Sequence, residues 1–346
     1  MKAVRINEHG GIDKLLYDEI DEPSCLPDKV KVKVKASALN HLDIWVRNGL
    51  PGLPIPLPLI MGCDASGTIV EIGINVNNLQ LGDDVVIQPG TFCSNCDFCK
   101  EGRENYCSNY GILGETENGT LAEYIILKPA NIYKKPEHLS FPEAASMPLV
   151  FMTAYQMLIK RAKLQPGEVV LIYGGSSGVG SAAIQICRDL GAQIIATAGN
   201  NSKAEFCKKL GANHVVNHNN ENWLDDVKQI AGKFGVNVIF EHVGSATWKQ
   251  SIRILSKGGR LVTCGATTGA DVNINLAHLF MKQQSILGST MSSVDTFKEV
   301  MNKIKYKKYK PTVDKIFAMK DIRVAHEYME RRQQSGKVVL VPEINE

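Results

Sequence analysis

Hydrophobic and polar positions follow two different patterns along the chain. In about the first 140 residues, short segments such as DKVKVKVKASAL (28–39) and DDVVIQP (83–89) are separated by Gly and Pro. The alternation in the first of these is typical of a half-exposed β-strand. About the last 50 residues add a helical segment and the apolar run KVVLV (337–341). These patterns predict a β-rich N-terminal region and a C-terminal helix and strand.

A different pattern begins at residue 168. The β-branched apolar run EVVLIY (168–173) is followed at once by GGSSGVG (174–180), and SAAIQICRDLGA (181–192) then has helical periodicity that ends at Gly191. Further apolar runs follow, separated by helical segments such as 202–210 and 221–232: AQIIATAG (192–199), ANHVVNH (212–218), VNVIFEHVG (236–244) and GGRLVTCGATTG (258–269). Strands that alternate with helices predict an α/β fold with a doubly wound parallel sheet.

The turn between the first of these strands and its helix carries candidate chemistry. In a dinucleotide-binding turn the first glycine makes the bend, the middle one admits the pyrophosphate and the last lets helix and strand pack closely. Gly175 and Gly180 occupy the outer places and Ser177 the middle one. Serine still offers an amide and a hydroxyl to a phosphate, so we expect the whole turn to bind a dinucleotide: Gly175, Ser176, Ser177, Gly178, Val179 and Gly180.

The end of the second strand indicates which dinucleotide binds. Folds that prefer NAD place an acidic residue there, about 20 residues after the turn, for the ribose 2′-hydroxyl. This chain has Asn200, Ser202 and Lys203 instead. These residues offer donors and no carboxylate that would repel a 2′-phosphate, so the sequence favours NADP(H).

Four of the nine cysteines cluster in FCSNCDFCKEGRENYC (92–107), a polar stretch without hydrophobic periodicity. Cys93, Cys96, Cys99 and Cys107 have the short gaps that let one loop fold four thiolates around a tetrahedral ion. Four protein ligands leave no open position, so we expect one structural zinc per chain. An iron–sulfur cluster is the alternative, because four thiolates can hold that group too.

Length and composition set the broad class. The chain has 346 residues, more than one hydrophobic core usually supports, so we expect two domains. A net charge of +3 is too small to argue for nucleic acid or a membrane surface, and the basic run KIKYKKYK (303–310) is interpreted as a solvated helix end. No apolar run approaches the roughly 20 residues of a membrane span. The N-terminus has no apolar signal segment, so we expect a cytoplasmic protein with reduced cysteines.

The whole chain resembles the medium-chain dehydrogenase/reductase superfamily, and within it the NADP-dependent zinc-binding dehydrogenases of the quinone oxidoreductase type. The similarity rests on the glycine turn, the four-cysteine lobe and several further motifs: NGTLAEYIILKP, EHVGSATW, KGGRLVTCGATTG, ILGSTM and GKVVLVP. The resemblance implies a GroES-like catalytic domain at 1–145 with a zinc lobe at about 90–110, a Rossmann NADP-binding domain at 146–292, and a return to the catalytic domain at 293–346. It also implies a substrate between the domains and a homodimer or homotetramer.

Zinc alcohol dehydrogenases of this superfamily hold a second, catalytic zinc. Their ligands lie in the stretches that match NHLD (40–43), GCDASG (62–67) and MPLVFMTAY (147–155), where this chain has Asn40, Cys63 with Asp64, and Leu149. Asn40 is a poor zinc ligand and Leu149 is none, so we expect no catalytic zinc. Two alternatives stay open: a softer cage of Cys63, Asp64 and His41, and simple packing of Cys63.

Without a Lewis acid, the expected reaction is reduction of a bond that is already electrophilic, in a quinone, an enone or an enoyl thioester such as acryloyl-CoA. The resemblance places Asn40 against the nicotinamide, Thr153 under its ring and Asp43 as an orienting group. We expect Asp64 to hydrogen-bond within the cleft or to a basic partner. The resemblance also implies that the backbone of four residues binds the nicotinamide half of the cofactor: Val243, Gly265, Ala266 and Thr267. For Asn40, capping of HLDIWVRNG (41–49) is the structural alternative. The competing functions are a zinc-dependent alcohol or aldehyde dehydrogenase and, from another class, a family member recruited as a structural or nucleic-acid-binding protein.

Overall fold

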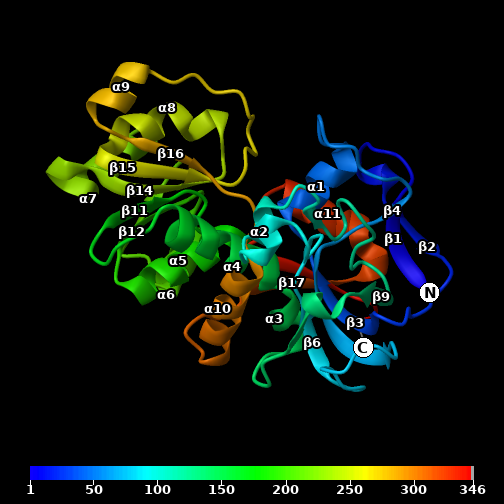
Figure 1. The fold of residues 1–346 in the computed structure, drawn as a ribbon. Coiled ribbons are helices and arrows are strands. Elements are labelled where there is room, and N and C mark those ends of the chain that lie inside the picture. Colours follow the sequence, from blue (N-terminus) through cyan, green and yellow to red (C-terminus); the bar gives the residue numbers. More distant parts are fainter. Residues whose placement is uncertain (344–346) are drawn as a thin grey trace. The chain divides into compact units, whose positions relative to one another are not determined.

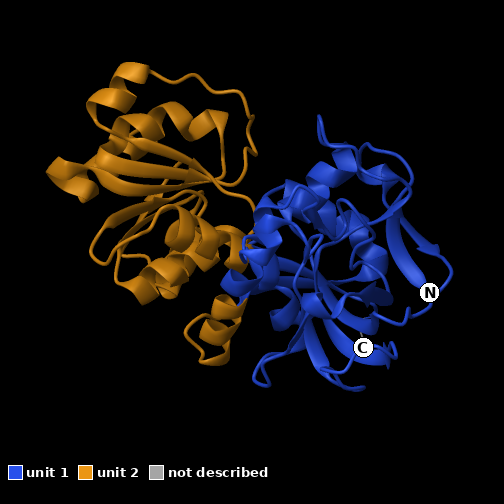
Figure 2. Ribbon diagram, in the orientation of Figure 1, with its two compact units in different colours: residues 1–149, 293–297, 311–346 blue, residues 150–292, 298–310 orange. Residues whose placement is uncertain are grey.

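The computed structural model describes residues 1–343 and divides them into two compact units (Figure 2). Among the described residues, the first unit comprises 1–149, 293–297 and 311–343, and the second comprises 150–292 and 298–310. Helix α10 (Val294–Lys305) therefore begins in the first unit and ends in the second. Within residues 1–343, no helix is long and apolar enough to span a membrane.

The first unit is built on a seven-stranded sheet around β3 (Val30–Ala38). Val30, Val32 and Val34 point into a core shared with Ile69 and Ile87, as the alternating sequence predicts. The strand order is β10-β6-β5-β3-β18-β17, and β9 also pairs with β3. The partners are β5 (Asp64–Ile72), β6 (Asp84–Ile87), β9 (Tyr124–Leu127), β10 (Ile132–Lys134), β17 (Val313–Ala318) and β18 (Lys337–Val341).

Smaller elements complete this unit. A three-stranded sheet has the order β2-β1-β4, and β7 pairs with β8. The strands are β1 (Lys2–Ile6), β2 (Leu16–Glu19), β4 (Leu59–Ile60), β7 (Gly90–Thr91) and β8 (Gly111–Ile112). The helices are α1 (His41–Asn48), α2 (Asp97–Lys100), α3 (Phe141–Ala145) and α11 (Ile322–Glu330), with short 3-10 turns at Ile12–Lys14, Glu104–Tyr106, Pro129–Asn131 and Met319–Asp321.

The second unit is a parallel six-stranded sheet with the order β13-β12-β11-β14-β15-β16, flanked by helices (Figure 1). This arrangement confirms the expected doubly wound α/β fold. The strands are β11 (Val169–Ile172), β12 (Gln193–Ala198), β13 (His214–Asn217), β14 (Val236–Glu241), β15 (Leu255–Thr263) and β16 (Ser285–Gly288). The helices are α4 (Pro148–Tyr155), which the π-helical segment Gln156–Arg161 extends, α5 (Gly178–Leu190), α6 (Asn201–Leu210), α7 (Trp223–Ala231), a 3-10 turn at Gly232–Phe234, α8 (Ser245–Ile254) and α9 (Leu276–Met281).

A buried histidine makes the stability of the first unit depend on pH. His326 on α11 is 1% exposed, and its Nδ1 accepts a hydrogen bond from Arg47 at 3.2 Å. Burial, helped by the Arg47 charge, lowers the pKa of His326 from 6.5 to about 3. In the unfolded chain, His326 therefore becomes protonated below about pH 6.5, whereas in the folded chain it stays neutral until about pH 3. Stability is present above pH 6.5 and is lost as the pH falls through this window, by about 1.4 kcal/mol per unit.

We expect His326→Asn, which keeps an acceptor for Arg47, to flatten this dependence. In urea unfolding, the wild type should lose about 2 kcal/mol from this group between pH 7 and pH 5, and the variant should not. The exposed His138 provides a matched control, because His138→Asn should leave the wild-type slope unchanged. Equal slopes for wild type and His326→Asn would contradict the assignment.

Candidate active site

Three strands of the first unit deliver polar side chains to one buried place. Ala38 at the end of β3 pairs with Asp64 at the start of β5 and with Val339 of β18. Asn40 follows β3, and Lys337 begins β18. All three side chains are buried, with exposed fractions of 5% for Asn40, 0% for Asp64 and 3% for Lys337. A strongly polar cluster thus lies at adjacent strand ends, where the sequence analysis named Asn40 and Asp64 but not Lys337.

Asn40 occupies the N-cap position of α1 and forms a capping box with Asp43, as the structural alternative expects, and its side chain also bonds within the buried cluster. Its Nδ2 donates to Asp64 Oδ2 at 2.9 Å and to Cys63 Sγ at 3.2 Å, and its Oδ1 accepts from Lys337 Nζ. The backbone amide of Asn40 donates to Asp43 Oδ2 at 2.7 Å. Burial raises the pKa of Asp43 to about 6. Asn40, Asp43 and Asp64, three of the four predicted catalytic residues, therefore belong to one connected network.

The donor set of this network does not fit a catalytic zinc. Asp64 Oδ1 accepts from the amide of Leu149 at 2.9 Å, and Oδ2 accepts from Asn40 and from Lys337, the latter at 3.0 Å. Burial raises the pKa of Cys63 well above its usual value, whereas a metal ligand must be a thiolate. The ring of His41 packs edge-on against Trp45 at 5.4 Å. Over residues 1–343, Cys63, Asp64 and His41 do not form a group whose donor atoms could share an ion.

The four-cysteine lobe does have the geometry of a zinc site. The sulfur atoms of Cys93, Cys96, Cys99 and Cys107 all lie within 4.8 Å of one another. Cys93 Sγ is 3.8 Å from Cys99 Sγ and 3.5 Å from Cys107 Sγ, close to the separation of about 3.8 Å that a tetrahedral ion with Zn–S bonds of about 2.3 Å requires. The residues present therefore fit a structural zinc.

The glycine turn of the second unit fits a dinucleotide. A side chain at Gly180 would clash with the carbonyl oxygen of Gly174, and one at Gly175 would lie 2.9 Å from Ala196 Cβ. The turn therefore packs closely against the neighbouring strand and the start of the helix, as a dinucleotide-binding turn requires. Ser177 caps α5 by accepting from the amide of Gly180 at 3.0 Å. The first amides of a helix, here those of Gly178 and Val179, have no partner within it and can meet a phosphate.

The predicted 2′-phosphate residues lie at the start of α6. Asn200 Oδ1 caps this helix by accepting from the amide of Lys203 at 2.9 Å and from the hydroxyl of Ser202 at 2.8 Å. Two residues that the sequence analysis did not name come close. Asn219 donates to the carbonyl of Gly199 at 2.8 Å, and a side chain at Gly199 would lie 3.3 Å from His218 Nε2. The adjacency of β12 and β13 in a parallel sheet is the signal that could have found them.

The predicted nicotinamide residues come together at the ends of β14 and β15. The amide of Thr268 donates to the carbonyl of Val243 at 2.8 Å, and the amide of Thr267 donates to the carbonyl of His242 at 3.4 Å. Glu241, which is fully buried, accepts from the amides of Val243 and Gly244 at 2.5 and 3.1 Å. Glu241 thus fixes the turn that carries Val243. Gly265 and Ala266 lie in the facing loop, and Thr153 is buried in α4.

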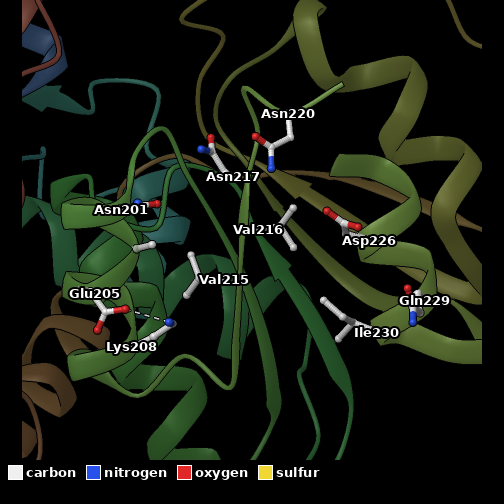
Figure 3. A pocket seen from close by; sticks show the side chains of 11 residues that line it. Asn201, Glu205, Lys208, Val215, Val216, Asn217, Asn220, Asp226, Gln229 and Ile230 are labelled. Atoms are coloured by element: carbon white, nitrogen blue, oxygen red, sulfur yellow. Dashed lines mark hydrogen bonds and ion pairs between the residues drawn. The ribbon is translucent and has the colours of Figure 1, made fainter. Parts of the chain in front are cut away.

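A pocket of about 500 Å³ in the second unit lies around the edge strand β13 (Figure 3). Side chains of α6, β13 and α7 surround it, and Glu205 and Lys208 form an ion pair there at 2.8 Å. The charges of its lining are mixed, because Asp226 faces it as well. No residue predicted to bind the dinucleotide lines it. This pocket therefore does not compete with the sites above as a candidate active site.

Comparisons with known proteins agree with the fold and the turn, which together define a nucleotide-dependent dehydrogenase. The chain matches the alcohol dehydrogenase GroES-like domain over residues 26–137 and the zinc-binding dehydrogenase family over residues 178–305. It is 32% identical to a zinc-type alcohol dehydrogenase-like protein of Schizosaccharomyces pombe, over 98% of this chain and 99% of that one. The chain therefore belongs to the medium-chain dehydrogenase/reductase superfamily and is an NAD(P)-dependent oxidoreductase.

Other relatives differ in the activity that their names give. Crotonyl-CoA carboxylase/reductase of Cereibacter sphaeroides is 31% identical, over 96% of this chain and 84% of that one. Quinone oxidoreductase of Homo sapiens is 30% identical, over 99% and 98%. The crystal structure of an NAD-dependent alcohol dehydrogenase superposes with a TM-score of 0.95 at 39% identity, covering 99% of this chain and 100% of that one. The similarities therefore establish that the protein is an oxidoreductase. They do not determine its substrate, which has to be argued from the chemistry of the site.

Proposed function

We propose that this protein is an NADPH-dependent reductase of an activated double bond, in a quinone, an enone or an enoyl thioester such as acryloyl-CoA. The proposal rests on the atoms of Asn40, Cys63 and Asp64 that would have to bind a metal. Those of Asn40 and Asp64 are hydrogen-bonded to other protein groups, and the raised pKa of Cys63 keeps it a neutral thiol. An alcohol dehydrogenase of this superfamily uses zinc at that place to polarise a carbonyl. A substrate that is already electrophilic does not need it.

NADPH, when bound, supplies a hydride. The protein must then hold the substrate and donate hydrogen bonds to the carbonyl oxygen on which negative charge collects. We propose that Asn40 faces the nicotinamide, that Thr153 lies under its ring, and that Asp43 and Asp64 hold Asn40 in its orientation. The bonds from Asn40 to Asp64 and of Asp43 to the Asn40 amide support the second assignment.

We further propose one structural zinc in the four-cysteine lobe and a preference for NADP(H) over NAD(H). The tetrahedral spacing of the sulfur atoms supports the zinc. The absence of an acidic residue at positions 199–203, where β12 ends, supports the cofactor preference. A cytoplasmic location fits a site that needs reduced cysteines, and all nine cysteines are free.

The subunits are proposed to associate as a homodimer or homotetramer through the β16 edge of the parallel sheet. Leu276, Phe280 and Met281 on the neighbouring α9 are 67%, 68% and 71% exposed, which is unusual for large apolar side chains. We expect Phe280→Glu with Met281→Glu to give monomers in light scattering. Phe234→Glu, at another exposed phenylalanine, should not, and a monomeric wild type would contradict the proposal.

A second candidate, a zinc-dependent alcohol or aldehyde dehydrogenase, is favoured by the name of the superposed crystal structure. The two are separated by assaying NADPH oxidation with 1,4-benzoquinone, 2-cyclohexen-1-one and crotonyl-CoA, and NAD(P)⁺ reduction with primary and secondary alcohols. The proposal predicts turnover in the first set. Turnover restricted to the alcohols would favour the second candidate, and tight NADPH binding with no turnover of any substrate would favour a non-enzymatic role.

A further inference from the structure

Lys337 is the only residue of the buried cluster whose side chain carries a positive charge, and it is 3% exposed. Its Nζ donates to Asn40 Oδ1 and, at 3.0 Å, to Asp64 Oδ2. The backbone amide of Lys337 is held in turn by the carbonyl of Thr312 at 2.9 Å. The ammonium group therefore lies between Asn40 and Asp64. In the zinc alcohol dehydrogenases, the stretches that match these two residues hold the catalytic metal.

The polar atoms around this ammonium already have partners within the protein. Asn40 accepts from Lys337 and donates to Asp64 and Cys63, while both oxygens of Asp64 accept bonds, from the Leu149 amide and from Asn40 and Lys337. A buried carboxylate requires a partner of opposite charge, and Lys337 provides one for Asp64. A divalent ion would have to displace the ammonium and take a proton from Cys63.

We infer that Lys337 is a built-in cation that occupies the place of the catalytic metal and excludes a divalent ion from the Asn40, Cys63 and Asp64 site. Lys337 neutralises Asp64 and holds the Asn40 amide with its nitrogen toward Cys63. Lys337 is thus a positioning residue, whichever substrate the enzyme reduces. The inference concerns metal binding and does not depend on the proposed function.

Zinc stoichiometry tests this inference without an activity assay. Protein purified without a metal-affinity tag is incubated with zinc, passed through a desalting column and analysed for zinc per chain. Asn40→Cys alone adds a sulfur ligand but keeps the ammonium, so it should retain the wild-type content of about one zinc, held by the lobe. Asn40→Cys with Lys337→Met offers two sulfurs and a carboxylate, and it should bind about one zinc more.

The matched control is Asn40→Cys with Lys31→Met, because Lys31 is another buried lysine of the same unit, 8% exposed and paired with Glu22. It should stay at the wild-type zinc content. Added zinc should also raise the melting temperature of Asn40→Cys with Lys337→Met. The rise should be larger than the one that zinc causes in Asn40→Cys with Lys31→Met. A second zinc in Asn40→Cys alone, or no additional zinc in the Lys337→Met combination, would overturn the inference.

A second measurement applies if the zinc-binding variant does not fold. Lys337→Met leaves Asp64 buried without its counter-charge and should lower the melting temperature, whereas Lys337→Met with Asp64→Asn removes both charges and should recover part of the loss. If the double change is as destabilising as the sum of the single changes, Lys337 does not neutralise Asp64 and the inference fails.

Discussion

Replacing Cys99 with serine is expected to release the proposed structural zinc and unfold the lobe around residues 90–110. Three cysteines remain, but the tetrahedral shell is open, and structural zinc contributes about 10 to 16 kcal/mol of apparent binding free energy in small peptides. The lobe also contacts the start of α10, where Glu104 accepts from the amide of Val294 at 3.1 Å. Elemental analysis should show zinc falling from about one per chain to nearly none, and limited proteolysis should cut the lobe.

The control for this change is Cys25→Ser, since Cys25 lies outside the cluster and donates to the carbonyl of Lys29 at 3.4 Å, which a serine hydroxyl can also do. This variant should keep its zinc and resist the protease as the wild type does. Full zinc content in Cys99→Ser would show that the four sulfurs are not the ligand set. Iron and sulfide in place of zinc would support the iron–sulfur alternative.

Asn200→Asp is expected to reverse the cofactor preference. Aspartate has the same shape as asparagine, so the cap on the Lys203 amide should survive while a negative charge appears where the 2′-phosphate is expected. Like charges a few ångström apart near a protein surface repel by about 3 kcal/mol, which is about 100-fold in affinity. The ratio of Kd for NADPH to Kd for NADH, from fluorescence titration, should rise by about that factor.

The matched control is Asn213→Asp. Asn213 precedes β13, at the edge of the parallel sheet opposite to Asn200, which follows β12. Asn213 Oδ1 accepts from the amide of Ile194 at 2.8 Å, and aspartate keeps that acceptor. The added charge lies away from the predicted phosphate, so the preference should not change. An unchanged preference in Asn200→Asp as well would mean that another part of the protein selects the cofactor.

The parallel sheet was predictable because its signals are local. The run at 168–173 contains β11, and the helix predicted after the turn ends at Leu190, with Gly191 in the left-handed conformation at a φ of 83°. Propensity, the glycine turn and the closing glycine all lie within 25 residues, so no distant contact was needed. The cysteine cluster was predictable for the same reason, since its spacing alone brings the thiols together.

A basic partner for Asp64 was among the expectations, but its identity as Lys337 was not predictable, because it depends on strand register. Lys337 and Asn40 are 297 positions apart, and only the pairing of β18 with β3 brings them together. The basic run at 303–310 shows the same limit. Lys305 and Lys307 are exposed as expected, but Tyr309 is 2% exposed and stacks on Phe151 at 5.6 Å, a contact that charge patterning does not reveal.

The most direct test of the central claim is the product formed from 2-cyclohexen-1-one and NADPH, identified by gas chromatography. This substrate offers a carbon–carbon double bond and a carbonyl to the same hydride. A protein that reduces activated double bonds without a catalytic metal should give cyclohexanone. Formation of 2-cyclohexen-1-ol would mean that the carbonyl is the bond reduced, which is alcohol dehydrogenase chemistry, and it would contradict the account.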